Sequence, residues 1–242
     1  MISDQDRKML KDVIAREDAW MADRRVRWSV SRDYGELRRF GHEISGFLNA
    51  TFDPDKRRPG PADLWCRFVD RRGKTIGSVA IALFRDCSLA ALVDSCHLWH
   101  DNPPEGWQDR MQIDFSRLVA MGDVVHAGAT MLHRDWRNHG IGDTTGRFSN
   151  HMIRLARARW LSEHNADWWT GFFRSAMFRN RITLYAHGID PDDCVKFMEG
   201  YIPVLGFSEQ VYAMQVPVPK MITALRDHAV DRPQNGRESG PA

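Results

Sequence analysis

The chain has 242 residues, 43% of them apolar, and its 34 Lys and Arg against 32 Asp and Glu give a formal charge of +2. This length suits one domain of about 200 residues with accessory ends, or two small domains, and the apolar content argues against wholesale disorder. The near-neutral charge provides no general field for nucleic acid or an anionic membrane, so we expect any bound anion to be met by local groups.

The remaining whole-chain features concern location. No stretch of the sequence approaches the roughly 18 apolar residues of a membrane span, and residues 1–12 are charged throughout, unlike a secretion signal. The cysteines form no CxxC pair and are expected to be reduced thiols: Cys66, Cys87, Cys96 and Cys194. We therefore expect a cytoplasmic protein with no membrane partner.

Helical spacing predicts the first elements, and a period of two predicts those that follow. Ser3 with Asp6 resembles a capping box, and Asp33 is expected to cap a second helix. Three prolines and a glycine in 53–61 break regular structure. The elements predicted for this half are helices over 4–22 and 33–50, strands over 63–69 and 75–84, and a short helix near 89–98.

The second half alternates strands and helices. The predicted elements are strands over 113–119 and 123–132, a helix over 142–164, a strand over 167–173, a helix over 175–187, strands over 197–201 and 208–217, and a helix over 219–229. This order predicts an α/β (α+β) fold, a three-layer domain with a central, mostly antiparallel mixed sheet flanked by helices. We expect a helical extension over 1–27, the main domain over 28–218, and a C-terminal helix and mobile tail over 219–242.

The segment from Leu132 to Gly142 carries the most informative motif, because it runs from a predicted strand into a predicted helix. Gly140 and Gly142 allow a tight turn and close approach to a ligand, and the helix start presents unpaired N–H groups. Arg137 can add a charge-assisted contact. The pattern favours a phosphate or pyrophosphate site. A Walker loop would need a lysine, and a dinucleotide fingerprint would need its third glycine one residue before Gly146.

These residues resemble the pyrophosphate loop of the GNAT acyltransferase superfamily, Arg/Gln-x-x-Gly-x-Gly/Ala, which Arg137, Gly140 and Gly142 match; Arg134 replaces a frequent proline. The resemblance implies a GNAT-like domain, acetyl-CoA or another acyl-CoA as co-substrate, and a small-molecule or peptide amine as acceptor. It assigns cofactor binding to Leu132, His133, Arg134, Arg137, Asn138, His139, Gly140, Ile141 and Gly142.

Acyl transfer to an amine requires a base, donors for the oxyanion and an acid for the departing thiolate. The resemblance takes the oxyanion donors from backbone N–H groups of the strand at 124–133 and suggests Tyr185 as the acid, with Tyr201 as rival. Tyr185 departs from the family spacing, and it could instead pack in the core. His126 and Asp114 are the candidate bases, although His126 could equally be a hydrogen-bonded histidine within the sheet, and water can carry the proton.

Alternatives remain open at this point. The segment 113–119, with Asp114 and Arg117, resembles a strand of acyl-homoserine-lactone (autoinducer) synthases, which share the fold but commonly lack the loop glycines. A non-catalytic acyl-CoA-binding module is the third reading. We expect no metal, because Cys96, His97 and His100 lack a second pair at zinc spacing, and no nucleic-acid partner. A homodimer stays open. The acceptor site is expected from 33–60 and 86–116.

Overall fold

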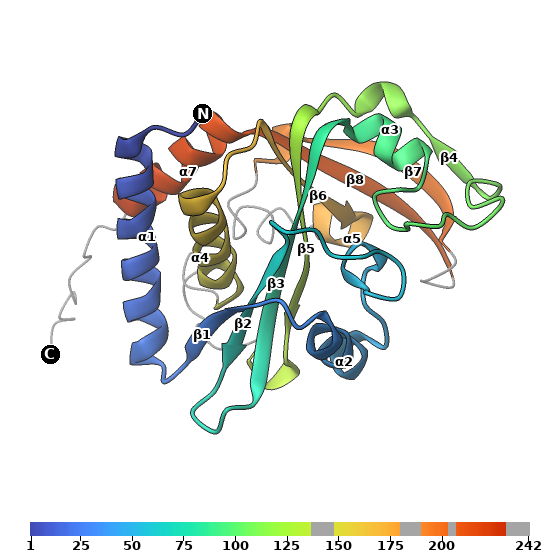
Figure 1. Cartoon of the computed structure of the whole chain (residues 1–242). Helices are drawn as coiled ribbons and strands as arrows, with labels where there is room; N and C mark the ends of the chain where they lie inside the picture. Colours follow the sequence, from blue (N-terminus) through green and yellow to red (C-terminus); the bar gives the residue numbers. More distant parts are fainter. Residues whose placement is uncertain (137–147, 180–189, 203–206, 231–242) are drawn as a thin grey trace, which may run out of the picture.

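One mixed, mostly antiparallel sheet forms the centre of the computed structural model (Figure 1), which describes residues 1–136, 148–179, 190–202 and 207–230. The strands are β1 (Arg27–Ser31), β2 (Leu64–Val69), β3 (Thr75–Ser88), β4 (Met111–Ile113), β5 (Met121–Leu132), β6 (Trp168–Arg174), β7 (Cys194–Ile202) and β8 (Phe207–Pro217). Their order in the sheet is β1-β2-β3-β5-β6-β8-β7-β4. Among these pairings, only that of β5 with β6 is parallel.

Helices cover both faces of the sheet. They are α1 (Asp4–Asp23), α2 (Tyr34–Ser45), α3 (Leu89–Asp94), α4 (Phe148–Glu163), α5 (Ser175–Arg179) and α7 (Val218–Val230). In Figure 1, α1, α4 and α7 lie on one side of the central strands, and α2 and α3 on the other. Alternation along β3 explains these layers, because Val79 and Ile81 join the core beneath α1, α4 and α7, whereas Ala80 and Ala82 face α2.

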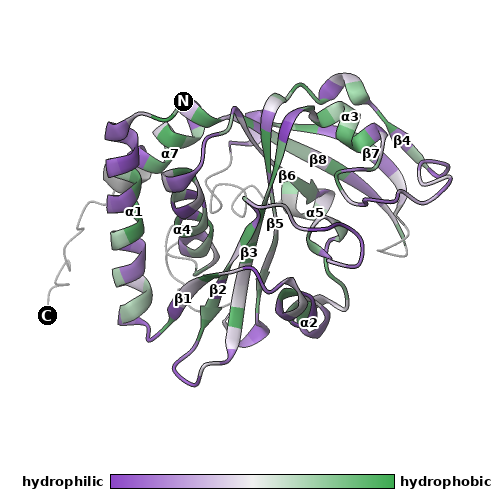
Figure 2. Cartoon of the chain, viewed as in Figure 1, coloured by the Kyte–Doolittle hydropathy of each residue, from purple (hydrophilic) through white to green (hydrophobic). Residues whose placement is uncertain are grey.

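The helix α1 belongs to the main core. Leu10, Val13 and Met21 are fully or almost fully buried in the same cluster as Trp160 of α4 and Leu225 of α7. Ser3 caps the helix by accepting a hydrogen bond from the Asp6 N–H at 3.1 Å. Figure 2 shows apolar residues concentrated along the central strands and polar residues interspersed along α1.

The fold class predicted from the sequence is confirmed: a mixed α/β arrangement whose mostly antiparallel sheet is flanked by helices. Among the differences from the prediction are one helix boundary and one additional strand. The second helix ends at Ser45 rather than near 50, because Gly46 adopts a left-handed φ of 77° and Asn49 caps a separate 3-10 turn. The strand β1 was not predicted, because its five residues are too few to show a period.

The strand predicted over 113–119 is wrong. The ladder of β4 ends at Ile113, and Phe115–Arg117 form a 3-10 turn. Asp114 causes this ending, because its carboxylate accepts from the Ser116 N–H at 3.2 Å and from the Arg117 Nε at 3.2 Å. Such local side-chain bonds offer the backbone an alternative to a strand ladder.

The helices predicted over 142–164 and 175–187 are present where the structure describes them, as α4 and α5; residues 142–147 and 180–187 lie outside the described residues, as does most of the predicted tail. Within the described ranges, no helix is long and apolar enough to cross a membrane.

Candidate functional site at the fork of two parallel strands

The segment with the glycine motif follows β5 in the chain. β5 ends at Leu132, a 3-10 turn covers Arg134–Trp136, and α4 then leads into β6, which runs parallel to β5. Ligands of such β-α-β units bind beyond the carboxyl ends of the parallel strands. The predicted pyrophosphate residues Arg137, Asn138, His139, Gly140, Ile141 and Gly142 lie outside the described residues, as does Tyr185.

The two parallel strands form a fork. They pair over three positions only, of which the last joins His126 to Thr170. β5 continues to Leu132 and β6 to Arg174, but no pairing between these continuations is found in the described strands. On this side of β5, no strand among the described residues pairs with the backbone beyond His126.

A β-bulge lies in β5 just past the fork. Between Ser78 and Ala80 of β3 the register advances from Met131 to Gly128 on β5, so one extra residue is inserted there. Ala129 takes a left-handed φ of 45°, and its carbonyl accepts from the Ser78 hydroxyl at 2.8 Å. Because a bulge bends its strand and increases the local twist, it explains why β5 turns away from β6.

The described residues that lead into the glycine motif have distinct surroundings. Leu132 packs against the main core. His133 bonds through its N–H to the Ile76 carbonyl at 2.7 Å, and its Nε2 lies 3.1 Å from the Lys74 ammonium. Arg134 is 87% exposed, so its guanidinium is accessible to an anion. Of these three residues, Arg134 is the one whose cation is exposed, and its Nε lies 3.6 Å from the Asp135 carboxylate.

His126 sits at the fork, where β5 and β6 separate, and is almost fully buried. Its ring lies between those of Phe52 and Phe172, with centroids 6.3 and 4.9 Å away. Thr170 donates its hydroxyl proton to the Val125 carbonyl at 2.8 Å, so its Oγ1 accepts from His126 Nδ1 at 3.3 Å. This fixes the neutral tautomer with the proton on Nδ1 and the lone pair on Nε2.

Burial, as the larger cause, and the positive charge of Arg57 together lower the pKa of His126 to about 3. The unfolded chain takes up this proton below about pH 6.5, whereas the folded chain does not, so stability is full above pH 6.5 and falls as pH falls. We expect His126 to lower the free energy of unfolding by about 2 kcal/mol as the pH falls from 6.5 to 5.

The variant His126→Phe should show a correspondingly shallower loss of stability in urea unfolding between pH 6.5 and 5. His97, which is exposed, supplies the control: His97→Phe should keep the wild-type slope. If the free energy of unfolding depends on pH equally in wild type and His126→Phe, the buried ring does not lower stability in acid as its packing implies.

Asp114 lies far from the fork. Its N–H bonds to the Phe197 carbonyl of β7 at 2.7 Å, next to β4 at the end of the sheet. The strands β6, β8 and β7 separate β4 from β5. The structure therefore does not bring together Asp114 and His126, and the Asp114 carboxylate is engaged by Ser116 and Arg117, which lowers its pKa.

The two segments expected to form the acceptor site meet beside His126. Asp101 accepts from the Arg58 N–H at 2.8 Å, and its own N–H bonds to the Lys56 carbonyl at 2.9 Å. A buried ion pair between Arg57 and Asp63 holds this loop, and the Arg57 guanidinium lies 5.0 Å from the Phe84 ring centroid. The loop at 50–63 is thus fixed against the face of the sheet on which His126 lies.

Sequence reasoning missed the neighbours of His126. Thr170 lies 44 residues away along the chain, and nothing in its local sequence marks it. Phe52 precedes the irregular stretch 53–61 and Arg57 lies within it; both fall in the range expected to form the acceptor site, but neither was singled out. Arg57 and Asp63, six residues apart around Pro59 and Pro61, were the one local signal: an Arg and an Asp that a turn can bring together.

Comparisons with known proteins add the following. No protein-family model matches the chain, and no curated protein matches it. Solved structures do match: spermidine/spermine N-acetyltransferase SpeG from Vibrio cholerae has 13% identity and a TM-score of 0.45, covering 82% of this chain and 96% of that chain. A protein from Acinetobacter baylyi assigned as an acetyltransferase has 11% identity and a TM-score of 0.43, covering 79% of this chain and 92% of that chain.

A protein assigned as a phosphinothricin N-acetyltransferase has 6% identity and a TM-score of 0.38, covering 79% of this chain and 98% of that chain. All three of these neighbours are named as acetyltransferases. At these identities and TM-scores, the similarity concerns the course of the chain alone.

Proposed function

We propose that the chain is a cytoplasmic GNAT-type N-acyltransferase, which moves an acetyl or other acyl group from acyl-CoA to a small-molecule or peptide amine. One observation carries the proposal: the strand that precedes the Arg137–Gly142 motif separates from its parallel neighbour at His126. A gap between diverging strands and an anion-binding motif beyond their ends suit an elongated ligand with a pyrophosphate at one end.

The gap offers backbone groups to the rest of the ligand. Acyl-CoA carries amide groups along its pantetheine arm, and such groups can pair with a free strand edge as a peptide does. The thioester would then lie near the fork, where N–H groups of β5 can stabilise the oxyanion. The arm would take the place that a paired strand occupies in a regular sheet.

The acceptor amine approaches, in this proposal, from the face that carries His126 and the loop at 50–63. A pKa near 3 makes Nε2 of neutral His126 too weak a base to take the proton of an ammonium, so in this proposal Nε2 accepts a hydrogen bond that positions the acceptor amine, and the amine loses its proton to bulk solvent before it attacks. Tyr185 protonates the departing thiolate. Asp114 has no part in this mechanism, since three strands separate its end of the sheet from the fork.

Ligand-induced stabilisation tests the assignment of the motif. Acetyl-CoA at about 100 times its Kd should add about 2.7 kcal/mol and raise Tm by roughly 5–10 °C. Gly140→Asp and Gly142→Asp should each lose this increase, because a carboxylate then faces the pyrophosphate. Gly46→Asp is the matched control: a Cβ there meets nothing within 4 Å, and although the φ of 77° strains any side chain, aspartate is among the residues that adopt it most readily, so this variant should start from a lower Tm and keep the increase. No increase in wild type, or an equal increase in both folded motif variants, contradicts the proposal.

Release of CoA against a panel of amines separates an enzyme from a binding module. Wild type should release CoA with at least one amine, and Tyr185→Phe should lower this turnover while keeping the Tm increase. A Tm increase with no CoA release from any amine favours the non-catalytic module.

A further inference from the structure

The strand β1 leaves one end of the sheet open. It pairs with β2 over five positions, from Arg27 with Val69 to Ser31 with Trp65, and has no other neighbour among the described strands. Its ladder has no bulge, its sequence has no proline, and its one charge is at its first residue, Arg27. Bulges, prolines and charged side chains are devices that protect sheet edges from pairing with another chain. Of these three, β1 has only the charge of Arg27.

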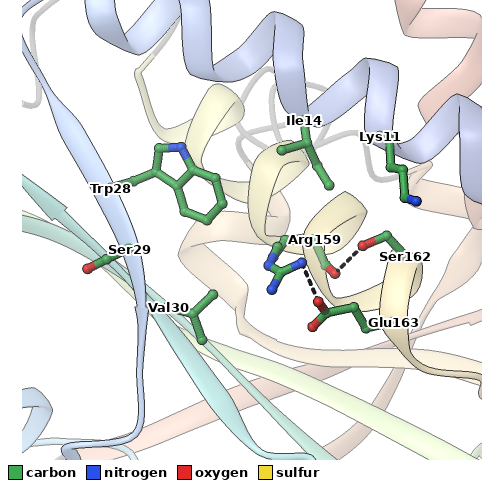
Figure 3. Close-up of a pocket in the computed structure, with 8 residues that line it drawn as sticks. All are labelled: Lys11, Ile14, Trp28, Ser29, Val30, Arg159, Ser162 and Glu163. Atoms are coloured by element: carbon green, nitrogen blue, oxygen red, sulfur yellow. Dashed lines mark hydrogen bonds and ion pairs between the residues drawn. The ribbon is translucent and has the colours of Figure 1, made fainter.

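A groove runs beside this edge. It has a volume of about 610 Å³ and lies between β1, α1 and the end of α4 (Figure 3). Trp28 and Val30 point from β1 into the groove toward Ile14, whereas Ser29 points away from it. Val30 remains 37% exposed, so an apolar row of β1 is uncovered where the edge is open.

We propose that β1 pairs with β1 of a second copy of this chain, antiparallel and centred on Ser29, to form a two-fold dimer with a continuous sheet. In this register Trp28 stands opposite Val30 of the second copy, and Arg27 opposite Ser31. Each Val30 is then covered by a tryptophan ring, and aromatic with β-branched is a favourable cross-strand pair.

The pattern of β1 identifies a second copy as the occupant. About Ser29 the strand is self-complementary, as a two-fold interface requires: an apolar residue meets an apolar one, and a cation meets a small hydroxyl. The groove is lined by Lys11 on α1 and by the ion pair of Arg159 with Glu163 on α4, so it carries no large excess of one charge that would select a strongly acidic or basic segment over a second copy.

Cysteine cross-linking tests the register. Residues directly opposite have Cβ atoms about 4.5–5.5 Å apart, close to disulfide range. Only position 29 faces itself, so Ser29→Cys should give a covalent dimer under mild oxidation. Ser31→Cys and Arg27→Cys should not, because each stands about 13 Å from its own copy; the double variant Arg27→Cys/Ser31→Cys should cross-link. Wild type controls for the four native cysteines.

Sedimentation over a range of concentrations tests the association itself. Wild type should reach the mass of a dimer, and Val30→Lys should raise the dimer Kd by roughly tenfold or more, because it removes the apolar cross-strand pair and places on the edge strand a lysine, the charge that opposes edge pairing, in a groove that already holds Lys11. Val119→Lys is the matched control, since Val119 is 56% exposed on another part of the surface.

A monomer at all concentrations overturns the proposal. So does a dimer that Val30→Lys leaves intact and that Ser29→Cys does not cross-link, and so does association with a different protein through β1 while the purified chain stays monomeric. None of these readouts uses acyl-CoA, so the result is independent of the proposed function.

Discussion

Replacement of Glu17 by alanine should lower the free energy of unfolding by about 3–5 kcal/mol, because it removes the anion from a buried charged cluster. Glu17 is 1% exposed on α1. Its carboxylate lies 2.5 Å from His151 Nδ1 and accepts from Arg154 Nε at 3.1 Å, both on α4. Trp20 stacks on the His151 ring at 3.5 Å. The variant leaves two cationic or hydrogen-bonding groups of α4 buried without their carboxylate.

Urea unfolding followed by circular dichroism measures this loss. Asp12→Ala is the matched control, because Asp12 is exposed on the same helix, and it should change stability by less than about 0.5 kcal/mol. If both variants lose the same amount, the cluster adds nothing net to the docking of α1.

The pH dependence of Glu17 gives a second check of this expectation. Burial by itself raises the pKa of Glu17, but the His151 hydrogen bond and the Arg154 charge outweigh it, and the pKa is lowered. A lowered acid pKa means that the stabilisation is present above about pH 4.5 and is lost as pH falls through the folded value. The difference between wild type and Glu17→Gln should therefore shrink in acid.

The elements that the sequence predicted well are those with local causes. Ser3 and Asp33 cap their helices as expected, since a cap needs only the next three residues. The long strands β3 and β5 and the helix α4 bury regular apolar patterns. Glu17 itself could have been found, because Val13, Glu17 and Met21 share one helix face at spacing four, which puts a carboxylate in an apolar stripe.

The site was less predictable because its geometry comes from distant parts of the chain. The sequence placed His126 on a strand, but its contacts with Thr170 and Phe172, and the burial and Arg57 charge that lower its pKa, arise only when the sheet forms. The bulge at Ala129 has no sequence signal, since alanine is not a residue that favours a positive φ. At Asp114 the local sequence was misleading: its alternating pattern predicted a strand, but the hydrogen bonds of its carboxylate end the strand and begin a 3-10 turn.

Asp63→Ala should also lower the free energy of unfolding by about 3–5 kcal/mol, through the loss of a buried ion pair. The Asp63 carboxylate is 1% exposed and accepts from Arg57, from the Gly60 N–H at 2.9 Å and from the Leu83 N–H at 3.0 Å. Three donors lose their acceptor together, and one of them is a guanidinium. Asp55→Ala, in the same loop, removes an exposed partner of Arg38 and should cost less than about 1 kcal/mol.

The consequence for function follows from what the ion pair holds. Arg57 donates to the Thr51 carbonyl at 2.8 Å, and Leu83 lies on β3, so Asp63 ties the loop at 50–63 to the sheet beside His126. The proposed function assigns acyl-CoA binding to the Arg137–Gly142 motif, which follows β5 in the chain, and amine binding to the face that carries this loop. At a temperature where Asp63→Ala remains folded, we therefore expect a raised KM for the amine with an unchanged Tm increase from acetyl-CoA. An unchanged KM would mean that the loop does not contact the acceptor, whereas loss of the Tm increase would mean that the damage extends to the acyl-CoA side of the fork.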